Sequence, residues 1–395
     1  MAMKDFMFHL PTKVYFGKDA DRNIAQKIAP FGASRVMLVY GGGSVKKNGL
    51  LPRIQKDLEE GGMSWVEFGG VQPNPRVQHV RDGIALCKAE GIDFVLAVGG
   101  GSSLDTAKAI ACCTASDVDP WELTMKKVTP TATIPVGVVL TLAATGSEVS
   151  NAFVLNNPDI PKKKGYLHEL LRPAVAFLNP ENTFTVSAYQ TACGVVDAMM
   201  HTMERYYSRN GDTELIDRIA EGILQTLKHQ GKIAVQEPEN YEARSDVMWA
   251  ASLSISPLTL CGKDIAMSVV HQLENGISGL HPRVAHGAGL AVLYPAWAKY
   301  VCKYDIRRFS QLAVRVWGVP MDFEHPEAVA LAGIEAMKEY FRSLGMPVTM
   351  QDLDIGPEDY EAMAEMITAN GTFEVPSYLP LGKKEIMEIF KLAEE

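Results

Sequence analysis

Asp197 and His201 are the first two residues whose types and spacing suit a chemical task. They stand four residues apart in the segment GVVDAMMHTMERYY, whose apolar residues recur at helical spacing. Residues i and i+4 share one face of a helix, so both side chains can reach one ion. The same spacing also suits a capped or salt-bridged pair on the surface. Taken alone, this pair leaves both interpretations open.

Three of the nine histidines lie close together further along the chain. His271, His281 and His286 fall within the segment VVHQLENGISGLHPRVAHGAGLA, which carries little charge. One carboxylate with three imidazoles suits a borderline divalent ion such as Fe²⁺ or Zn²⁺. Neither segment contains a cysteine, which argues against a structural zinc site built on thiolates. Together the two segments favour a metal centre.

A run of glycines indicates a second kind of chemistry. It follows the apolar run FVLAV, precedes a segment of helical pattern, and consists of Gly99, Gly100, Gly101 and Ser102. At such a turn, free backbone N–H groups point at a ligand and the helix dipole adds about half a positive charge. Asp105 is placed to hold the following turn. The fingerprints GxGxxG and GK[ST] are absent, so the pattern predicts either a phosphate-bearing ligand or a tight turn that lets strand and helix pack closely.

A similar loop follows the apolar run RVMLVY, and it consists of Gly41, Gly42, Gly43 and Ser44. In NAD enzymes an acidic residue at such a strand end binds the ribose 2′-hydroxyl and would repel a 2′-phosphate. This segment has no carboxylate, and two lysines, Lys46 and Lys47, follow. We therefore expect the loop to accept the 2′-phosphate of NADP while residues 99–102 hold the pyrophosphate. A plain turn with solvated lysines is the alternative.

Two patterns divide the chain between the elements that would position these residues. Up to about residue 183, short β-rich runs alternate with amphipathic segments, and the runs are RVMLV, SWVEF, FVLAV, TATIPVGVV and AVAFL. This alternation predicts parallel βαβ units with helices on both faces of the sheet. From about Thr185, apolar residues recur at helical spacing. We predict an α/β nucleotide-binding domain over 1–183, an all-α domain over 184–395, and a ligand in a cleft between them.

Size and composition agree with this division and exclude some functions. A chain of 395 residues exceeds one core of ordinary size. The net charge of −9 argues against a nucleic acid or an anionic membrane as partner. No apolar stretch approaches the roughly 18 to 20 residues that span a bilayer, and the N-terminus lacks the apolar core of a signal peptide. The six scattered cysteines suit reduced thiols in a cytoplasmic enzyme.

Four blocks of the sequence are similar to those of a known family. GGGSSLDTAKAI, TLAATGSEVS, GVVDAMMHTMERYY and HGAGLA resemble, in this order, blocks of the iron-dependent (group III) alcohol dehydrogenases. The resemblance runs from FHLPTKVYFG to the LGKKEIMEIFKLA tail. Because GGGSVKK follows the second strand, the sequence most resembles the NADP(H)-dependent butanol dehydrogenase and aldehyde reductase branch. The resemblance implies the dehydroquinate synthase-like fold, with a Rossmann-like N-terminal domain and a helical C-terminal domain.

The resemblance also implies roles for single residues. The implied metal ligands, which are also the catalytic residues, are Asp197, His201, His271 and His286. His286 is preferred to His281 because it opens the HGAGLA block. The pyrophosphate contacts fall on residues 99–102, and the further cofactor contacts implied are Asn74, Thr141, Thr145 and Lys163. The KVYFG strand implies a homodimer, because it pairs across a two-fold axis in the family.

One position departs from the family pattern. Many members have a second histidine four residues after the third ligand, and here that position is Asn275. An asparagine forms hydrogen bonds but cannot shuttle a proton near pH 7. A proton route through this position is therefore not expected. His281 is expected to be an exposed loop residue, and the alternative is that it reaches the cleft in place of the missing histidine.

These observations predict reversible hydride transfer between NADP(H) and a small primary alcohol or aldehyde of the butanol and butanal class. A divalent metal, Fe²⁺ or alternatively Zn²⁺, would polarise the substrate oxygen. The alternatives are a polyol dehydrogenase of the same superfamily, a metal-dependent hydrolase and a non-catalytic nucleotide-binding protein. The hydrolase leaves both glycine loops unexplained, and the binding protein has no use for the metal ligands.

Overall fold

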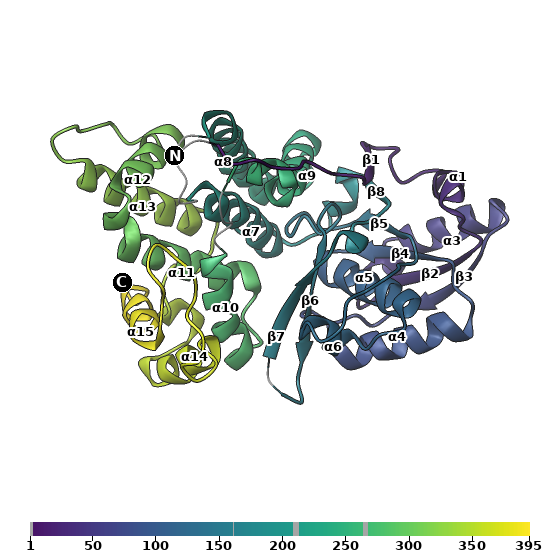
Figure 1. The fold of residues 1–395 in the computed structure, drawn as a ribbon. Coiled ribbons are helices and arrows are strands. Elements are labelled where there is room, and N and C mark those ends of the chain that lie inside the picture. Colours follow the sequence, from purple (N-terminus) through teal and green to yellow (C-terminus); the bar gives the residue numbers. More distant parts are fainter. Residues whose placement is uncertain (1–2, 161, 208–212, 264–267) are drawn as a thin grey trace. The chain divides into compact units, whose positions relative to one another are not determined.

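The computed structural model describes residues 3–160, 162–207, 213–263 and 268–395 (Figure 1). The chain forms two compact units, one comprising His9–Val186 and the other Ser187–Glu395 with the N-terminal segment that ends at Phe8. The segment joins the second unit because the Lys4 N–H donates to the Gly262 carbonyl at 3.2 Å. The boundary between the units therefore falls between residues 186 and 187, whereas the sequence analysis above placed it between residues 183 and 184.

The first unit is built on a six-stranded parallel sheet of order β1-β8-β5-β4-β2-β3. Its strands are β1 (Lys13–Phe16), β2 (Arg35–Tyr40), β3 (Ser64–Phe68), β4 (Phe94–Gly99), β5 (Val136–Leu140) and β8 (Val175–Leu178). The predicted α/β fold is thereby confirmed. Within the run TATIPVGVV the strand begins only after Pro135, which lacks the N–H that a central strand donates.

Helices cover both faces of the sheet. The core on one face joins β2 and β4 to α1 (Ile24–Ile28) and α3 (Leu50–Glu60). On the other face α5 (Gly101–Ser116) packs against β2, β4 and β5, and α4 (Val77–Ala89) packs against α5 (Figure 1). Residues 94–98 are fully buried, which explains their uninterrupted apolar run.

The strand order reverses between β2 and β4. The chain proceeds from β2 to β3 on one side, and then returns to place β4 on the other side of β2. In open α/β sheets, ligands bind at the carboxyl ends of the strands where such a reversal occurs. Tyr40 and Val98 are paired at these ends, and both glycine loops follow directly. The topology therefore brings the two loops to the same edge of the sheet.

An antiparallel hairpin, β6 (Ala152–Asn157) and β7 (Lys162–Leu167), adds to this unit. The sequence analysis did not predict it. The loop before α4 contacts the hairpin, because the Asn156 N–H donates to the Pro75 carbonyl at 2.7 Å. Two segments about eighty residues apart in the sequence are thus joined.

The second unit is helical, which confirms the predicted all-α domain. Its main helices are α7 (Ala188–Tyr206), α8 (Glu214–Gln236), α9 (Tyr241–Ile255), α10 (Val269–Leu280), α11 (His286–Val301), α12 (Ile306–Leu312), α13 (Pro326–Ser343), α14 (Tyr360–Ile367) and α15 (Lys383–Leu392). α7 packs against α8, α9 and α11, and α10 packs against α11 and α14. α11 is buried from Gly287 to Ala298. Helices α7 and α11 therefore form the centre of this unit.

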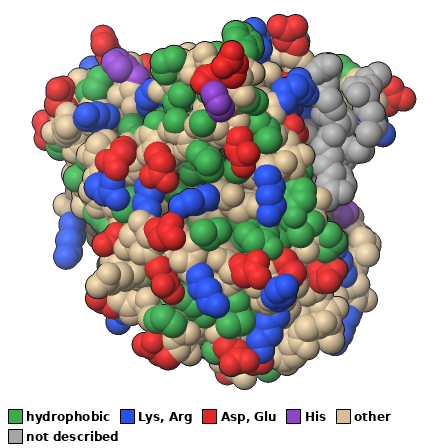
Figure 2. All heavy atoms as spheres, turned by 90° about the vertical axis from the view of Figure 1, so that its left-hand side faces the viewer, with side chains coloured by type: hydrophobic (Ala, Val, Ile, Leu, Met, Phe, Trp, Pro, Cys, Tyr) green, Lys and Arg blue, Asp and Glu red, His purple; other side chains and the backbone are tan. Residues whose placement is uncertain are grey.

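The surface of the helical unit shows no gathering of one charge on the face in Figure 2. Acidic and basic side chains are interspersed there among small apolar areas, over the residues that the structure describes. This face therefore lacks the basic footprint of a nucleic-acid binding surface. Among the described helices, none is both long and apolar enough to cross a membrane.

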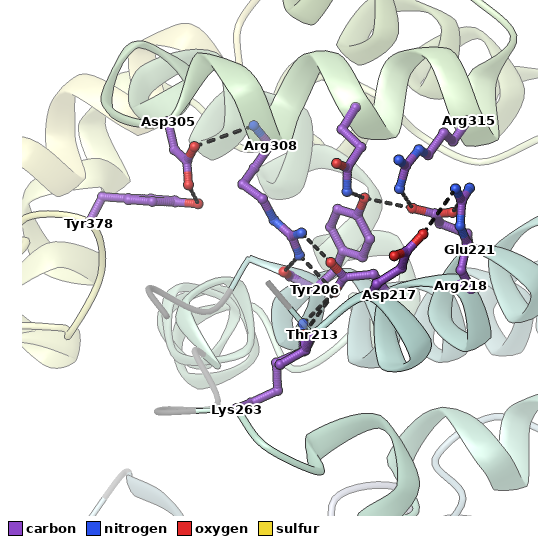
Figure 3. A network of polar contacts seen from close by, with 12 residues as sticks. Tyr206, Thr213, Asp217, Arg218, Glu221, Lys263, Asp305, Arg308, Arg315 and Tyr378 are labelled. Atoms are coloured by element: carbon purple, nitrogen blue, oxygen red, sulfur yellow. Dashed lines mark hydrogen bonds and ion pairs between the residues drawn. The ribbon is translucent and has the colours of Figure 1, made fainter. Parts of the chain in front are cut away.

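A buried ionic network holds the end of α7 (Figure 3). Arg308 donates to Asp217 and to the carbonyl of Tyr206, the last residue of α7, and Lys263 lies 2.5 Å from Asp217 Oδ1. The side chains of Arg308, Asp217 and Lys263 are only 4%, 5% and 1% exposed, respectively. Burial raises the pKa of Asp217, but Arg308 and Lys263 outweigh it, so the pKa lies below its usual value. The network therefore requires Asp217 in its ionised form.

Replacing Asp217 by asparagine should therefore destabilise the protein. The variant leaves two buried cations without their anion, a change that typically costs about 3 to 5 kcal/mol. Urea unfolding measures the loss. Glu214→Gln, on the same helix, is the control: its ion pair with Arg218 is exposed, so we expect a change within about 0.5 kcal/mol. Equal losses in the two variants would contradict the importance of the network.

Candidate metal and coenzyme sites

Helix α7 presents Asp197 and His201 on one buried face. The helix begins at a capped end, where the Ser187 side chain accepts from the Gln190 N–H. Asp197 is 4% exposed. The structure therefore excludes the surface pair that the spacing alone allowed.

Three histidine nitrogens converge on one oxygen of Asp197. The Nε2 atoms of His271, His201 and His286 lie 3.3, 3.7 and 4.0 Å from Asp197 Oδ1. His271 comes from the first turn of α10, and His286 opens α11. Ligands about 2.0 to 2.2 Å from a tetrahedral ion lie about 3.3 to 3.6 Å from each other. The ligand atoms of Asp197, His201 and His271 all lie within 4.8 Å of one another, so these three residues form the candidate site for a single first-row divalent ion, and His286 lies at its edge.

Two buried glutamates lie behind this cluster. Glu204, on α7, is 2.7 Å from Nδ1 of His271, and Glu274, on α10, contacts Nδ1 of His286. A carboxylate at Nδ1 leaves Nε2 as the nitrogen that points inward. Neither glutamate was predicted as a site residue from the sequence, although Glu204 stands seven residues after Asp197 and Glu274 three after His271.

Burial and neighbouring charges shift the acid–base behaviour of the cluster. Burial raises the pKa of Asp197, but His201, His271 and His286 outweigh it and hold the pKa far below its usual range. Burial lowers the pKa of His201 to about 3, which keeps this imidazole neutral. Burial also disfavours protonated His271, but Glu204 and Asp197 outweigh it and raise its pKa to about 10. The site is therefore electrostatically suited to a cation.

The remaining histidine of the segment lies elsewhere. His281 Nε2 is 3.0 Å from Asp359 Oδ2, and the side chain is largely buried. The expectation of an exposed loop histidine was therefore wrong, because a neighbouring carboxylate packs against it. Asn275 lies half-buried on α10, one turn after His271 and on the same face of the helix.

The two glycine loops need glycine for different reasons. A Cβ on Gly99 would come 2.6 Å from Ser103 Oγ, and one on Gly101 would come 2.7 Å from Thr145 Cγ2. The strand and helix thus pack closely there, as the tight-turn interpretation requires. Gly43 has φ +102°, a backbone conformation that favours glycine, and Gly42 faces open space.

Asp105 supports the segment after β5. Its Oδ1 accepts from Ser147 Oγ at 2.8 Å, and its Oδ2 accepts from the Val154 N–H at 2.9 Å. Lys108, one turn on, is buried and donates to Ser147 Oγ at 2.8 Å. Burial lowers the pKa of Lys108 to about 8. These contacts give Asp105 a structural role beside the glycine loop.

The other residues implied as coenzyme contacts fall into two groups. Thr141 and Thr145 lie beside the 99–102 loop, since the Thr141 N–H donates to the Gly99 carbonyl at 3.0 Å. Asn74 has a left-handed backbone (φ 56°) in the loop joined to the hairpin, and Lys163 is paired with Asn156 on that hairpin.

A carboxylate lies beside the 41–44 loop, where the sequence showed none. Glu67, from β3, is 2.5 Å from Lys46 Nζ, accepts from Gln55 at 2.9 Å and accepts from the Tyr40 hydroxyl. Sequence reasoning missed it because only the pairing of β3 with β2 brings it there. The sequence did offer one signal, because Glu67 is a charged residue in the second-to-last position of the strand SWVEF.

Family models match both units. Residues 11–180 match the model described as iron-containing alcohol dehydrogenase, and residues 191–393 match the C-terminal model of the Fe-containing alcohol dehydrogenase family. The chain belongs to the iron-containing alcohol dehydrogenase family. It is an alcohol dehydrogenase or aldehyde reductase, and membership implies a metal ion and a nicotinamide cofactor.

Named relatives span almost the whole chain. It is 39% identical over 390 residues to NADH-dependent butanol dehydrogenase A of Clostridium acetobutylicum, covering 98% of this chain and 99% of the relative. It is 37% identical over 380 residues to the NADPH-dependent aldehyde reductase YqhD of Escherichia coli, covering 93% and 94%. The crystal structure of NADH-dependent butanol dehydrogenase A from Thermotoga maritima matches with a TM-score of 0.95 and 33% identity, over 100% and 99% of the two chains.

Gly287→Ala should weaken metal binding by displacing His286. A Cβ at Gly287 would come 2.4 Å from the Cys193 carbonyl oxygen of α7, so α11 must move away from Asp197. We expect a loss of about 10- to 100-fold in metal affinity, as for other disturbed supports of metal ligands. Chelator competition with Zn²⁺ measures it.

Gly222→Ala on α8 is the matched control, because beyond its chain neighbours and the backbone of its own helix no atom lies within 4 Å of the added Cβ. Alanine should stabilise that helix by up to about 1 kcal/mol and leave metal affinity unchanged. Unaltered zinc affinity in Gly287→Ala would show that the close approach of α7 and α11 does not position His286.

Proposed function

We propose that this protein transfers a hydride reversibly between NADP(H) and a small primary alcohol or aldehyde of the butanol and butanal class. The observation that carries the proposal is the convergence of three imidazole Nε2 atoms on Asp197 Oδ1 in a member of this family. The substrate class is supported by relatives named as butanol dehydrogenases and an aldehyde reductase.

In this proposal Asp197, His201, His271 and His286 hold Fe²⁺, with Zn²⁺ as the alternative. The ion, when bound, supplies Lewis-acid polarisation of the substrate oxygen. Asp197 contributes the negative charge that retains the ion, and the three imidazoles contribute neutral nitrogen donors. Asn275, on the same helix face, can form hydrogen bonds but takes no proton, so the substrate proton would leave through water.

The coenzyme would lie along the carboxyl ends of β2 and β4. Residues 99–102 offer the N–H groups of the first turn of α5 to the pyrophosphate. Asn74, Thr141, Thr145 and Lys163 are the further contacts that we propose, and Asp105 fixes the segment that carries Thr145. The α/β unit alone supplies all these groups.

The choice of NADP(H) rests on the 41–44 loop. Within the loop no carboxylate faces the ribose, and the Ser44 hydroxyl and the half-exposed Lys46 ammonium are available to a 2′-phosphate. Glu67 opposes this choice, because its charge offsets that of Lys46. The pair therefore sets how strongly the loop prefers NADP(H) over NAD(H).

We also propose a cytoplasmic homodimer. The six cysteines are buried and unpaired, as expected for reduced thiols. β1 is one of the two edge strands of the sheet, so a second copy can extend the sheet through it.

Metal-stripped protein should regain butanal reduction when Fe²⁺ or Zn²⁺ is added. The loss of absorbance of the reduced nicotinamide measures it, with NADPH and NADH compared, and with 1,3-propanediol and glycerol tested in the oxidative direction. Restored oxidation of NADPH well above NADH supports the proposal. Activity with NADH alone contradicts the coenzyme choice, and preference for a diol or polyol contradicts the substrate.

Glu67→Gln should raise the ratio of kcat/KM for NADPH to that for NADH by about 5- to 10-fold. The change removes a negative charge a few ångströms from the proposed phosphate, an effect of about 1 kcal/mol at a solvated surface. Gly41→Asp should shift the preference the other way. Glu60→Gln, an exposed charge change on α3, is the control. An unchanged ratio in Glu67→Gln would place the 2′ group away from Lys46.

A further inference from the structure

The two oxygens of Glu204 have different partners. Oε1 accepts from the backbone N–H groups of Val270 and His271, at 2.6 and 3.3 Å, in the first turn of α10. Oε2 lies 2.7 Å from Nδ1 of His271. The side chain is almost fully buried at 2% exposure of the residue. One carboxylate thus caps a helix and also holds an imidazole on that helix.

Glu274 makes a similar contact with one decisive difference. Its Oε2 pairs with Nδ1 of His286, but its Oε1 accepts from the Ser278 hydroxyl, one turn further along α10. A hydroxyl both donates and accepts, so it can rotate to meet either an oxygen or an N–H group. A backbone N–H only donates. The partners of Glu204 therefore require two acceptor oxygens, whereas His286 and Ser278 can be met by one acceptor and one donor.

We propose that Glu204 is a positioning residue that sets the tautomer of His271, and that it does so only as a carboxylate. The inference rests on the metal site of the proposed function. When an ion is bound, His271 must be neutral; with Glu204 at Nδ1, its remaining proton would stay on Nδ1 and its Nε2 lone pair would be free for the ion beside Asp197. No comparable contact sets the tautomer of His201, because its Nδ1 has no hydrogen-bond partner among the described residues.

A glutamine at position 204 cannot meet both demands. If its oxygen caps the backbone N–H groups, its NH₂ group faces Nδ1 and donates to it, which moves the imidazole proton to Nε2 and blocks the ligand lone pair. If its oxygen turns to Nδ1–H, the NH₂ group meets two N–H donors at the start of α10. The first arrangement satisfies every group, so we expect it to prevail.

The experiment compares Glu204→Gln with its matched control Glu274→Gln. Both variants remove one buried carboxylate at Nδ1 of a histidine without changing side-chain size. Zinc affinity of the metal-free protein, measured by chelator competition, should fall about 10- to 100-fold in Glu204→Gln and less than about 3-fold in Glu274→Gln. In zinc-saturated protein with ¹⁵N-labelled histidine, the proton of His271 should move from Nδ1 to Nε2 in Glu204→Gln alone.

Equal losses of affinity in the two variants overturn the inference, and so does a loss in Glu204→Gln with the His271 proton still on Nδ1. If Glu204→Gln does not fold, Glu204→Asp decides, because it keeps two acceptor oxygens. Its zinc-loaded form must retain the proton on Nδ1 of His271. Absence of zinc and iron binding by the unaltered protein would instead refute the metal centre itself, which keeps the two failures distinct.

Discussion

The helical unit depends on the burial of one negative charge. A carboxylate as enclosed as that of Asp197 is tolerated only when cationic or hydrogen-bonding groups surround it. Three imidazoles from three helices meet this demand, so α7, α10 and α11 must come together at a single point. The close contact of Gly287 with the backbone of α7 and the ionic network at Tyr206 then hold α7 on both sides of that point. Charge compensation and helix packing impose the same geometry.

The α/β unit follows from a different constraint, the reversal of strand order between β2 and β4. A parallel sheet exposes the carboxyl ends of its strands along one edge, and the reversal leaves a crevice there. Both glycine loops begin at that crevice because each follows one of these two strands. The proposed coenzyme site thus depends on topology, while the candidate metal site depends on electrostatics.

Much of this was predictable from local pattern. The runs RVMLV, SWVEF and FVLAV became strands, and the i, i+4 spacing of Asp197 and His201 identified one face of a helix. Partners that only tertiary structure supplies were not predictable in the same way. Glu67 reaches the 41–44 loop by strand pairing, and Glu204 reaches His271 across two helices. The β6–β7 hairpin was missed because KKKGYL is polar and shows little alternation, and His281 gained its partner, Asp359, from a segment almost eighty residues away.

The unequal surroundings of the two glycine loops bear on how such an enzyme can change during evolution. Side chains of the protein itself enclose Gly99 and Gly101, so even a methyl group there disturbs the packing of β4 and α5. Gly42 faces open space, and a new side chain at that position displaces nothing. Mutations at Gly42 can therefore accumulate without harm to the fold, whereas Gly43 is constrained by its backbone conformation and the β4 loop by its packing. If the β2 loop binds the coenzyme as proposed, this difference would let coenzyme preference change while the reaction is kept, and relatives of almost equal identity to this chain are named for different coenzymes.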